Sequence, residues 1–139
     1  MIEINNLTTN PVDEVFLKKV AKMVLEGENK EKVELSIALV GQGRMRELNK
    51  KYLGKNRATD VLAFPYNDSD EVIVCLREVK KNVKRYKTTF EKELSEVLIH
   101  GILHLLGYDH KKGEKEAEKM REKENYYLLK IGKIGEGSG

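Results

Sequence analysis

The histidines of this chain have the spacing of a metal site. The sequence contains three histidines, and all of them lie in the segment HGILHLLGYDH, from His100 to His110. In a helix, His100 and His104 share one face, with their Cβ atoms about 5–6 Å apart. Gly107 allows the chain to leave the helix, and His110 follows three residues later. The pattern H-x-x-x-H-x-x-G-x-x-H has the spacing of the metzincin zinc motif. We therefore interpret the three histidines as metal ligands rather than as hydrogen-bonded core residues.

The ligand types, and the residue after the first histidine, indicate the chemistry. Three neutral imidazoles with an open fourth position are typical of a catalytic zinc site, although nickel and cobalt also bind such ligands. Zinc peptidases of the H-E-x-x-H type place a glutamate base after the first histidine, where this chain has Gly101. Three neutral ligands leave the full charge of a divalent ion in place, which suits an anionic phosphodiester better than a neutral amide. The residues therefore favour cleavage of a phosphodiester.

The histidine helix is expected to lie inside the protein. From Val97 to Leu106 the two histidines are the only polar side chains, and a helix this apolar is buried on most faces. Thr88, three residues before Glu91, predicts a capping box at the start of this helix.

Hydrophobic patterns predict the elements around it. Apolar alternation and β-branched runs predict strands over residues 2–6, 33–40, 61–64 and 72–76. Helical spacing predicts helices over residues 13–26, 77–86 and 114–130, and one after residues 41–43 whose Met45, Leu48 and Tyr52 share a face. We expect an α+β fold, a single domain in which a small mixed sheet packs with about five helices. The zinc site would lie on a central buried helix and the loop after it.

Length and composition restrict the class of protein. The 139 residues fit one hydrolase-like domain, residues 1–131, followed by a flexible glycine-rich tail, residues 132–139. The single cysteine, Cys75, allows no disulfide within the chain. There is no apolar run of membrane-spanning length and no signal-peptide pattern, so we expect a soluble, cytoplasmic protein without a membrane partner.

The net charge of +3 does not by itself indicate a nucleic-acid partner, but its distribution is uneven. One segment without acidic residues contains Lys80, Lys81, Lys84, Arg85 and Lys87. These side chains are candidates for contacts with RNA phosphates, although a run of charge is more often a solvated helix face. Tyr86 among them is expected to pack inward, with stacking on a base as the alternative.

Two longer blocks of sequence resemble a known family. The segment His100–His110 matches the signature of the YbeY family of bacterial ribosomal-RNA maturation factors, and LNKKYLGKNRATDVLAFP, Leu48–Pro65, resembles its second block. Glu71–Cys75 and Glu116–Met120 resemble further family segments. The resemblance implies a zinc-dependent, single-strand-specific endoribonuclease in ribosomal-RNA maturation, including the small-subunit 3′ end, and in ribosome quality control. Its partners would be ribosomal RNA and the ribosome or small subunit, not DNA.

The resemblance also assigns roles by position. It implies that His100, His104 and His110 hold one zinc ion. Family members typically have an arginine after the tyrosine of the second block, where this chain has Leu53. Lys55 and Arg57 are the candidates for catalytic contact with the scissile phosphate, with a solvated loop as the alternative.

Asp109 is a candidate for orienting a ligand imidazole from outside the ligand set, or else an exposed turn residue. Two other functions stay open. One is a non-catalytic, zinc-stabilised ribosome-assembly factor, which the loss of the arginine at Leu53 keeps in view. The other is an atypical zinc metallopeptidase, for which no substitute base is evident near the motif.

Overall fold

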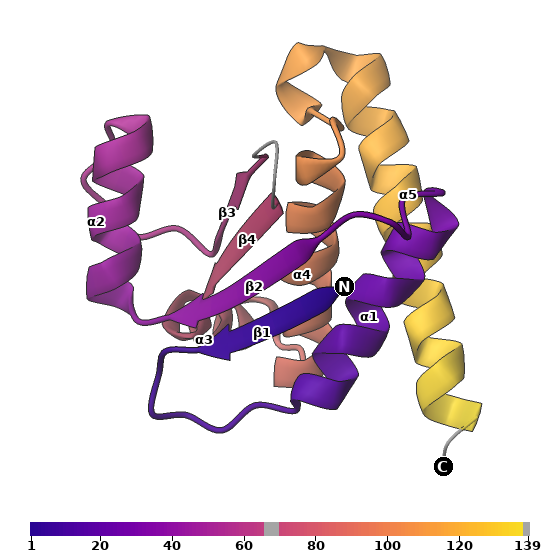
Figure 1. Cartoon of the computed structure of the whole chain (residues 1–139), viewed down its shortest axis with the longest axis horizontal. Helices are drawn as coiled ribbons and strands as arrows, with labels where there is room; N and C mark the ends of the chain where they lie inside the picture. The colour runs from indigo at the N-terminus through magenta and orange to yellow at the C-terminus, as the bar shows by residue number, and fades with distance from the viewer. Residues whose placement is uncertain (66–69, 138–139) are drawn as a thin grey trace.

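The computed structural model describes residues 1–65 and 70–137, with side chains described up to residue 132. Within this part, a four-stranded sheet packs with five α-helices and a short 3-10 helix (Figure 1). The strands are β1 (Ile2–Asn6), β2 (Leu35–Val40), β3 (Val61–Phe64) and β4 (Asp70–Cys75). The helices are α1 (Glu14–Gly27), α2 (Gln42–Leu53), α3 (Leu76–Tyr86), α4 (Phe90–Leu105), η1 (His110–Lys112) and α5 (Glu114–Gly137). The prediction of a mixed α+β domain is confirmed.

The sheet has the strand order β1-β2-β4-β3. β1 and β4 both pair with β2 in parallel, whereas β3 pairs with β4 in the antiparallel direction. β4 carries the continuous apolar run expected of a strand that is covered on both faces. None of the helices in the described residues has the length and apolar character needed to span a bilayer.

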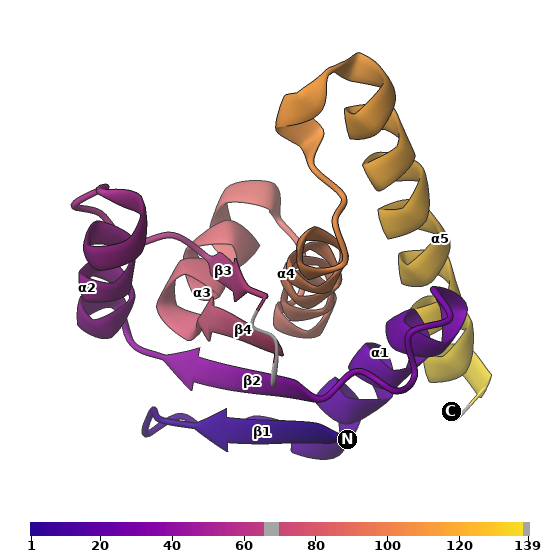
Figure 2. The same cartoon turned by 45° about the horizontal axis from the view of Figure 1, so that its top comes forward.

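Helices cover both faces of the sheet. Alternate residues of the central strands, such as Ile37 and Val72, belong to a large core shared with α1, α4 and α5. Their neighbours, such as Ala38 and Ile73, belong to a smaller core against α2. Figure 2 shows α4 nearly end-on between α3 and α5, and α4 contacts both of these helices as well as β3 and β4. The histidine helix is therefore the central helix of the larger layer.

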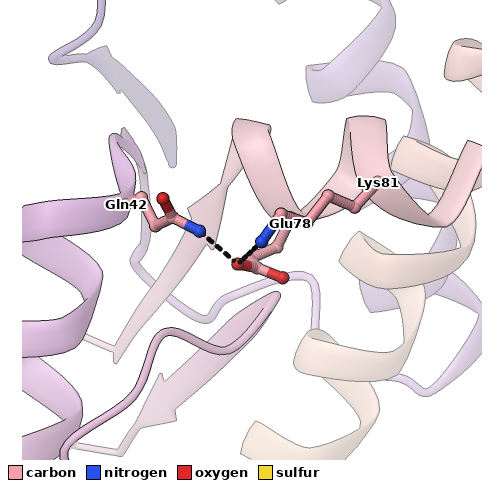
Figure 3. A network of polar contacts seen from close by, with 3 residues as sticks. All are labelled: Gln42, Glu78 and Lys81. Atoms are coloured by element: carbon pink, nitrogen blue, oxygen red, sulfur yellow. Dashed lines mark hydrogen bonds and ion pairs between the residues drawn. The ribbon is translucent and has the colours of Figure 1, made fainter.

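A polar contact joins helices α2 and α3. Gln42 Nε2 donates a hydrogen bond of 2.9 Å to Glu78 Oε1, and Lys81 Nζ lies 3.4 Å from the same oxygen (Figure 3). Gln42 begins α2 and Glu78 lies in the first turn of α3. The contact ties the start of α2 to α3.

Several boundaries differ from those expected from the sequence. Thr89, not Thr88, caps α4, and its hydroxyl accepts a hydrogen bond from Lys92 N at 3.2 Å. The prediction of Thr88 was wrong because α4 begins one residue later, at Phe90. The N–H of Thr88, which a capping box would pair with Glu91, instead donates to Val83 O at the end of α3. β2 begins at Leu35 rather than at Val33, whose N–H donates to Lys30 O in a turn.

The C-terminal helix and α2 also differ from the expectation. α5 continues to Gly137 instead of ending at residue 130, so its backbone extends into the segment expected to be a tail. Flexibility of residues 132–139 stays a prediction, and residues 138–139 lie outside the described part, as do residues 66–69 of the expected turn. Tyr52 shares helical spacing with Met45 and Leu48 but is 48% exposed, because burial along α2 ends at Asn49.

Candidate metal centre

α4 lies against the sheet through a glycine that follows the first histidine. A Cβ atom added at Gly101 would lie 2.7 Å from Val61 Cγ2 and 2.9 Å from Val72 Cγ1. Only glycine allows this approach of α4 to β3 and β4 without a shift. The same contact explains the missing glutamate of the peptidase motif, because a side chain at this position would point into the two strands.

The turn after α4 brings the third histidine back toward the first two. Leu106 caps the helix, and Gly107 has a φ of +107°, in the region that favours glycine. Tyr108 N then donates to Leu103 O, which reverses the chain, and His110 begins η1. The helix thus ends after His104 and the chain turns at Gly107, as the sequence predicts.

The three imidazoles converge. One ligand nitrogen from each of His100, His104 and His110 lies within 4.8 Å of the other two. The ring centroids are 5.3 to 5.7 Å apart. Nitrogen ligands about 2.1 Å from a tetrahedral ion are about 3.4 Å from one another, so small side-chain rotations bring this set onto one metal. The donor set therefore fits a metal ion held by three neutral nitrogens.

A carboxylate from α5 orients the first of these imidazoles. Glu124 Oε1 lies 2.6 Å from His100 Nδ1 and leaves Nε2 as the ligand atom. This is the usual arrangement of metal-bound histidine, whose second nitrogen donates to a carboxylate. The hydrogen bond to Glu124 raises the pKa of His100, while burial and the two neighbouring histidines lower the pKa of His104. Sequence reasoning missed Glu124, because α5 carries several glutamates and only packing shows which one reaches the site.

We expect Glu124→Ala to weaken metal binding about 10–100-fold while leaving the three ligands in place. Loss of the carboxylate removes the hydrogen bond that fixes the ring of His100. The measurement is the metal dissociation constant from competition with a chelator. Glu122→Ala is the matched control, because Glu122 is exposed on the same helix and, unlike Glu124, lines neither of the cavities that His100 lines. Equal affinities of the two variants would contradict the orienting role.

A second carboxylate holds the elements that complete the site. Glu28, at the end of α1, accepts hydrogen bonds from Tyr108 at 2.6 Å and from Tyr127, and Lys123 Nζ lies 3.3 Å away. Burial alone would raise the pKa of Glu28, but the hydrogen bonds from these donors outweigh burial, and the pKa of Glu28 is lowered. Burial and the hydrogen bond to Glu28 raise the pKa of Tyr108 to about 12. Glu28 thereby fastens both α5 and the loop that leads to His110.

The histidines open onto a cleft of about 570 Å³ whose lining has three basic residues against two acidic ones. Lys55 and Arg57, predicted as catalytic, line it from the exposed loop between α2 and β3. Asn49 holds this loop in place through two hydrogen bonds. Its side-chain Nδ2 donates to Arg57 O at 2.8 Å, and its backbone carbonyl accepts from Lys55 N at 3.3 Å. Leu53, in the place of the family arginine, also lines the cleft and is 56% exposed. Phosphate contact by Lys55 and Arg57 stays a prediction; the structure shows that both residues line the cleft.

Asp109 has a local role in the structure. Its Oδ1 accepts a hydrogen bond from Lys111 N at 2.9 Å and caps η1, and this contact lowers its pKa. Among the described residues, the carboxylate hydrogen-bonded to a ligand imidazole is that of Glu124. A direct orienting role for Asp109 stays a prediction without a supporting contact.

The basic segment of α3 lies on the surface, outside the histidine cleft. All five of its predicted RNA-binding residues are exposed: Lys80, Lys81, Lys84, Arg85 and Lys87. Tyr86 is 62% exposed, so the expectation that it packs inward was wrong. Tyr86 lies seven residues after Val79 and therefore on the same side of α3, but it is the last residue of the helix, beyond the buried Leu76 and Val79.

Comparisons with known proteins agree with this geometry. The family model described as Endoribonuclease YbeY matches residues 3–132. Endoribonuclease YbeY of Thermodesulfovibrio yellowstonii is 42% identical over 122 residues, covering 82% of this chain and 76% of that protein. Its counterpart in Chlorobium phaeovibrioides is 39% identical over 135 residues, covering 94% and 90%. The solution structure of a Thermotoga maritima protein aligns with 99% of this chain and 93% of its own, with a TM-score of 0.72 and 34% identity. Since the family model and both relatives extend over the helix, turn and loop that carry the histidines, this chain belongs to the YbeY family of endoribonucleases.

Proposed function

We propose that this protein is a zinc-dependent endoribonuclease that cleaves single-stranded RNA during ribosomal-RNA maturation, including the small-subunit 3′ end, and in ribosome quality control. The observation that carries the proposal is the convergence of three imidazoles at a cleft that Lys55 and Arg57 also line. We propose further that it acts in the cytoplasm, on RNA of the ribosome or its small subunit.

Each part of the cleft has a role in this reaction. Zinc held by His100, His104 and His110 would supply Lewis acidity toward a phosphodiester oxygen and lower the pKa of water. Lys55 and Arg57 line the same cleft. Their charges would bind the RNA backbone and stabilise negative charge that develops on the phosphate. Zinc is favoured over a harder metal such as magnesium because all three donors are nitrogens.

The alternative of a zinc peptidase loses support from the packing of α4. The position of the peptidase base is Gly101, whose Cβ direction is filled by β3 and β4. The alternative of a non-catalytic assembly factor is favoured by one observation, the exposed apolar side chain of Leu53 on the wall of the cleft.

The test combines metal content with RNA cleavage. Protein purified without a metal-affinity tag is expected to carry one zinc per chain by mass spectrometry and to cleave a single-stranded RNA fragment. His100→Ala is expected to lose cleavage. Zinc-loaded wild-type protein that binds RNA without cutting it would instead establish the assembly factor. Digestion of casein under the same conditions would establish the peptidase.

A further inference from the structure

An aromatic rim borders the histidine cleft on the side of α2. The rings of Tyr52 and Phe64 are 5.0 Å apart, and Phe64 lines the cleft that holds the three histidines. Tyr52 is 48% exposed, and Lys51 Nζ lies 5.2 Å from its ring centroid. An exposed ring with a cation beside it is the usual element by which proteins hold an unpaired base of a nucleic-acid strand.

A second exposed ring lines a neighbouring cavity. Tyr86, at the end of α3, faces a hollow of about 450 Å³ that is also lined by His100. On the outside, Tyr86 is followed by Lys87 and preceded by Arg85, both exposed. The ring of Tyr86 is thus flanked by a basic surface, and it lines the same cavity as the candidate ligand His100.

The two hollows adjoin one another. Asp60, Val61 and His100 line both of them, so these residues mark the junction of the two hollows. On the first side, the histidine cleft has Lys55, Arg57 and Lys111 against Asp60 and Asp109. On the second, the hollow at Tyr86 has Lys92 against Asp60, Glu93, Glu96 and Glu124. A phosphate is attracted to the first side and repelled from the second, whereas a neutral base can enter the second. The charges therefore orient a strand, with its scissile phosphate in the basic cleft.

We propose that single-stranded RNA crosses the metal centre with one base stacked on the Tyr52–Phe64 rim and another on Tyr86. The inference rests on the proposed function and adds to it the sites that hold the bases on either side of the cut. Both surfaces need a base that is free to leave its neighbours, so a duplex cannot use them. The two aromatic surfaces therefore give the cleft its preference for single strands.

The test measures binding of a fluorescent single-stranded RNA whose 2′-hydroxyls are methylated, by anisotropy at fixed salt. We expect Tyr52→Leu and Tyr86→Leu each to weaken binding about tenfold, as loss of one stacked base does. Tyr52→Phe and Tyr86→Phe are expected to bind like the wild type, because stacking needs the ring and not the hydroxyl. All of these side chains are exposed, so the fold tolerates the changes.

Tyr126→Leu is the matched control. Tyr126 is 49% exposed on α5 and has Lys130 Nζ 4.8 Å from its ring centroid, but it lies outside both hollows. It is expected to have no effect. If the wild type binds and cleaves RNA while both leucine variants bind equally well, the stacking proposal is overturned and the proposed function stands. If the wild type neither binds nor cleaves RNA, both fail together.

Discussion

His104→Ala is expected to abolish stoichiometric metal binding and, with it, RNA cleavage. His104 is the ligand in the last turn of α4, between a histidine one helical turn earlier and one beyond Gly107. Burial and the neighbouring imidazoles lower its pKa, so the neutral form that a metal requires is present near neutral pH. Removing a direct ligand leaves two nitrogens for the metal. The loss of metal affinity should therefore exceed the loss of about 10–100-fold that is typical when a residue that orients a ligand is removed.

Metal content by mass spectrometry and a chelator competition measure the effect, and circular dichroism shows that the helices persist. Lys55→Ala serves as the matched variant, because Lys55 lines the same cleft but does not belong to the group of three histidines that could hold the metal. It should keep one metal per chain and lose cleavage instead. If His104→Ala retained stoichiometric metal, the assignment of the ligands would be wrong.

The convergence of the three histidines was predictable because it is local in the sequence. His100 and His104 lie one helical turn apart, and the glycine turn alone brings His110 back. Glu124 and Glu28 were not predictable, since their partners lie 24 and 80 residues away along the chain. A glutamate that orients a ligand has the same local pattern as a glutamate on a solvated helix face. Only the packing of α5 against α4 separates the two.

The fold shows the same division between local and non-local information. The strands and helices followed from hydrophobic period, and β4 was recognised by its continuous apolar run. The errors concern side chains at the ends of elements, where Tyr52 and Tyr86 lie. Helical spacing places a ring on a face, but whether another element covers that face depends on how far the neighbouring layer extends. Both rings lie in the last turn of their helices, beyond the last buried residue.

Gly101→Ala is expected to destabilise the protein by about 1–3 kcal/mol, the usual cost of overpacking a filled core. The added Cβ would lie within 3 Å of side chains from two different strands, Val61 and Val72, so α4 must move away from the sheet. Gly101→Glu restores the peptidase sequence H-E-x-x-H, but it should cost several kcal/mol more because it forces a carboxylate into an apolar contact. Neither variant is expected to digest casein.

Urea unfolding of Gly101→Ala beside Gly43→Ala distinguishes packing from helix propensity. Gly43 lies in α2 with no atom within 4 Å of its Cβ direction, so alanine there should stabilise the helix by up to about 1 kcal/mol. Opposite signs for the two variants would show that the sheet presses on α4 at Gly101. Equal stabilisation would mean that α4 has room for a side chain at position 101. Packing against the sheet would then not explain why the glutamate of the peptidase motif is missing. The expected result links fold to chemistry: the contact that seats the histidine helix on the sheet also excludes the glutamate that peptide hydrolysis requires.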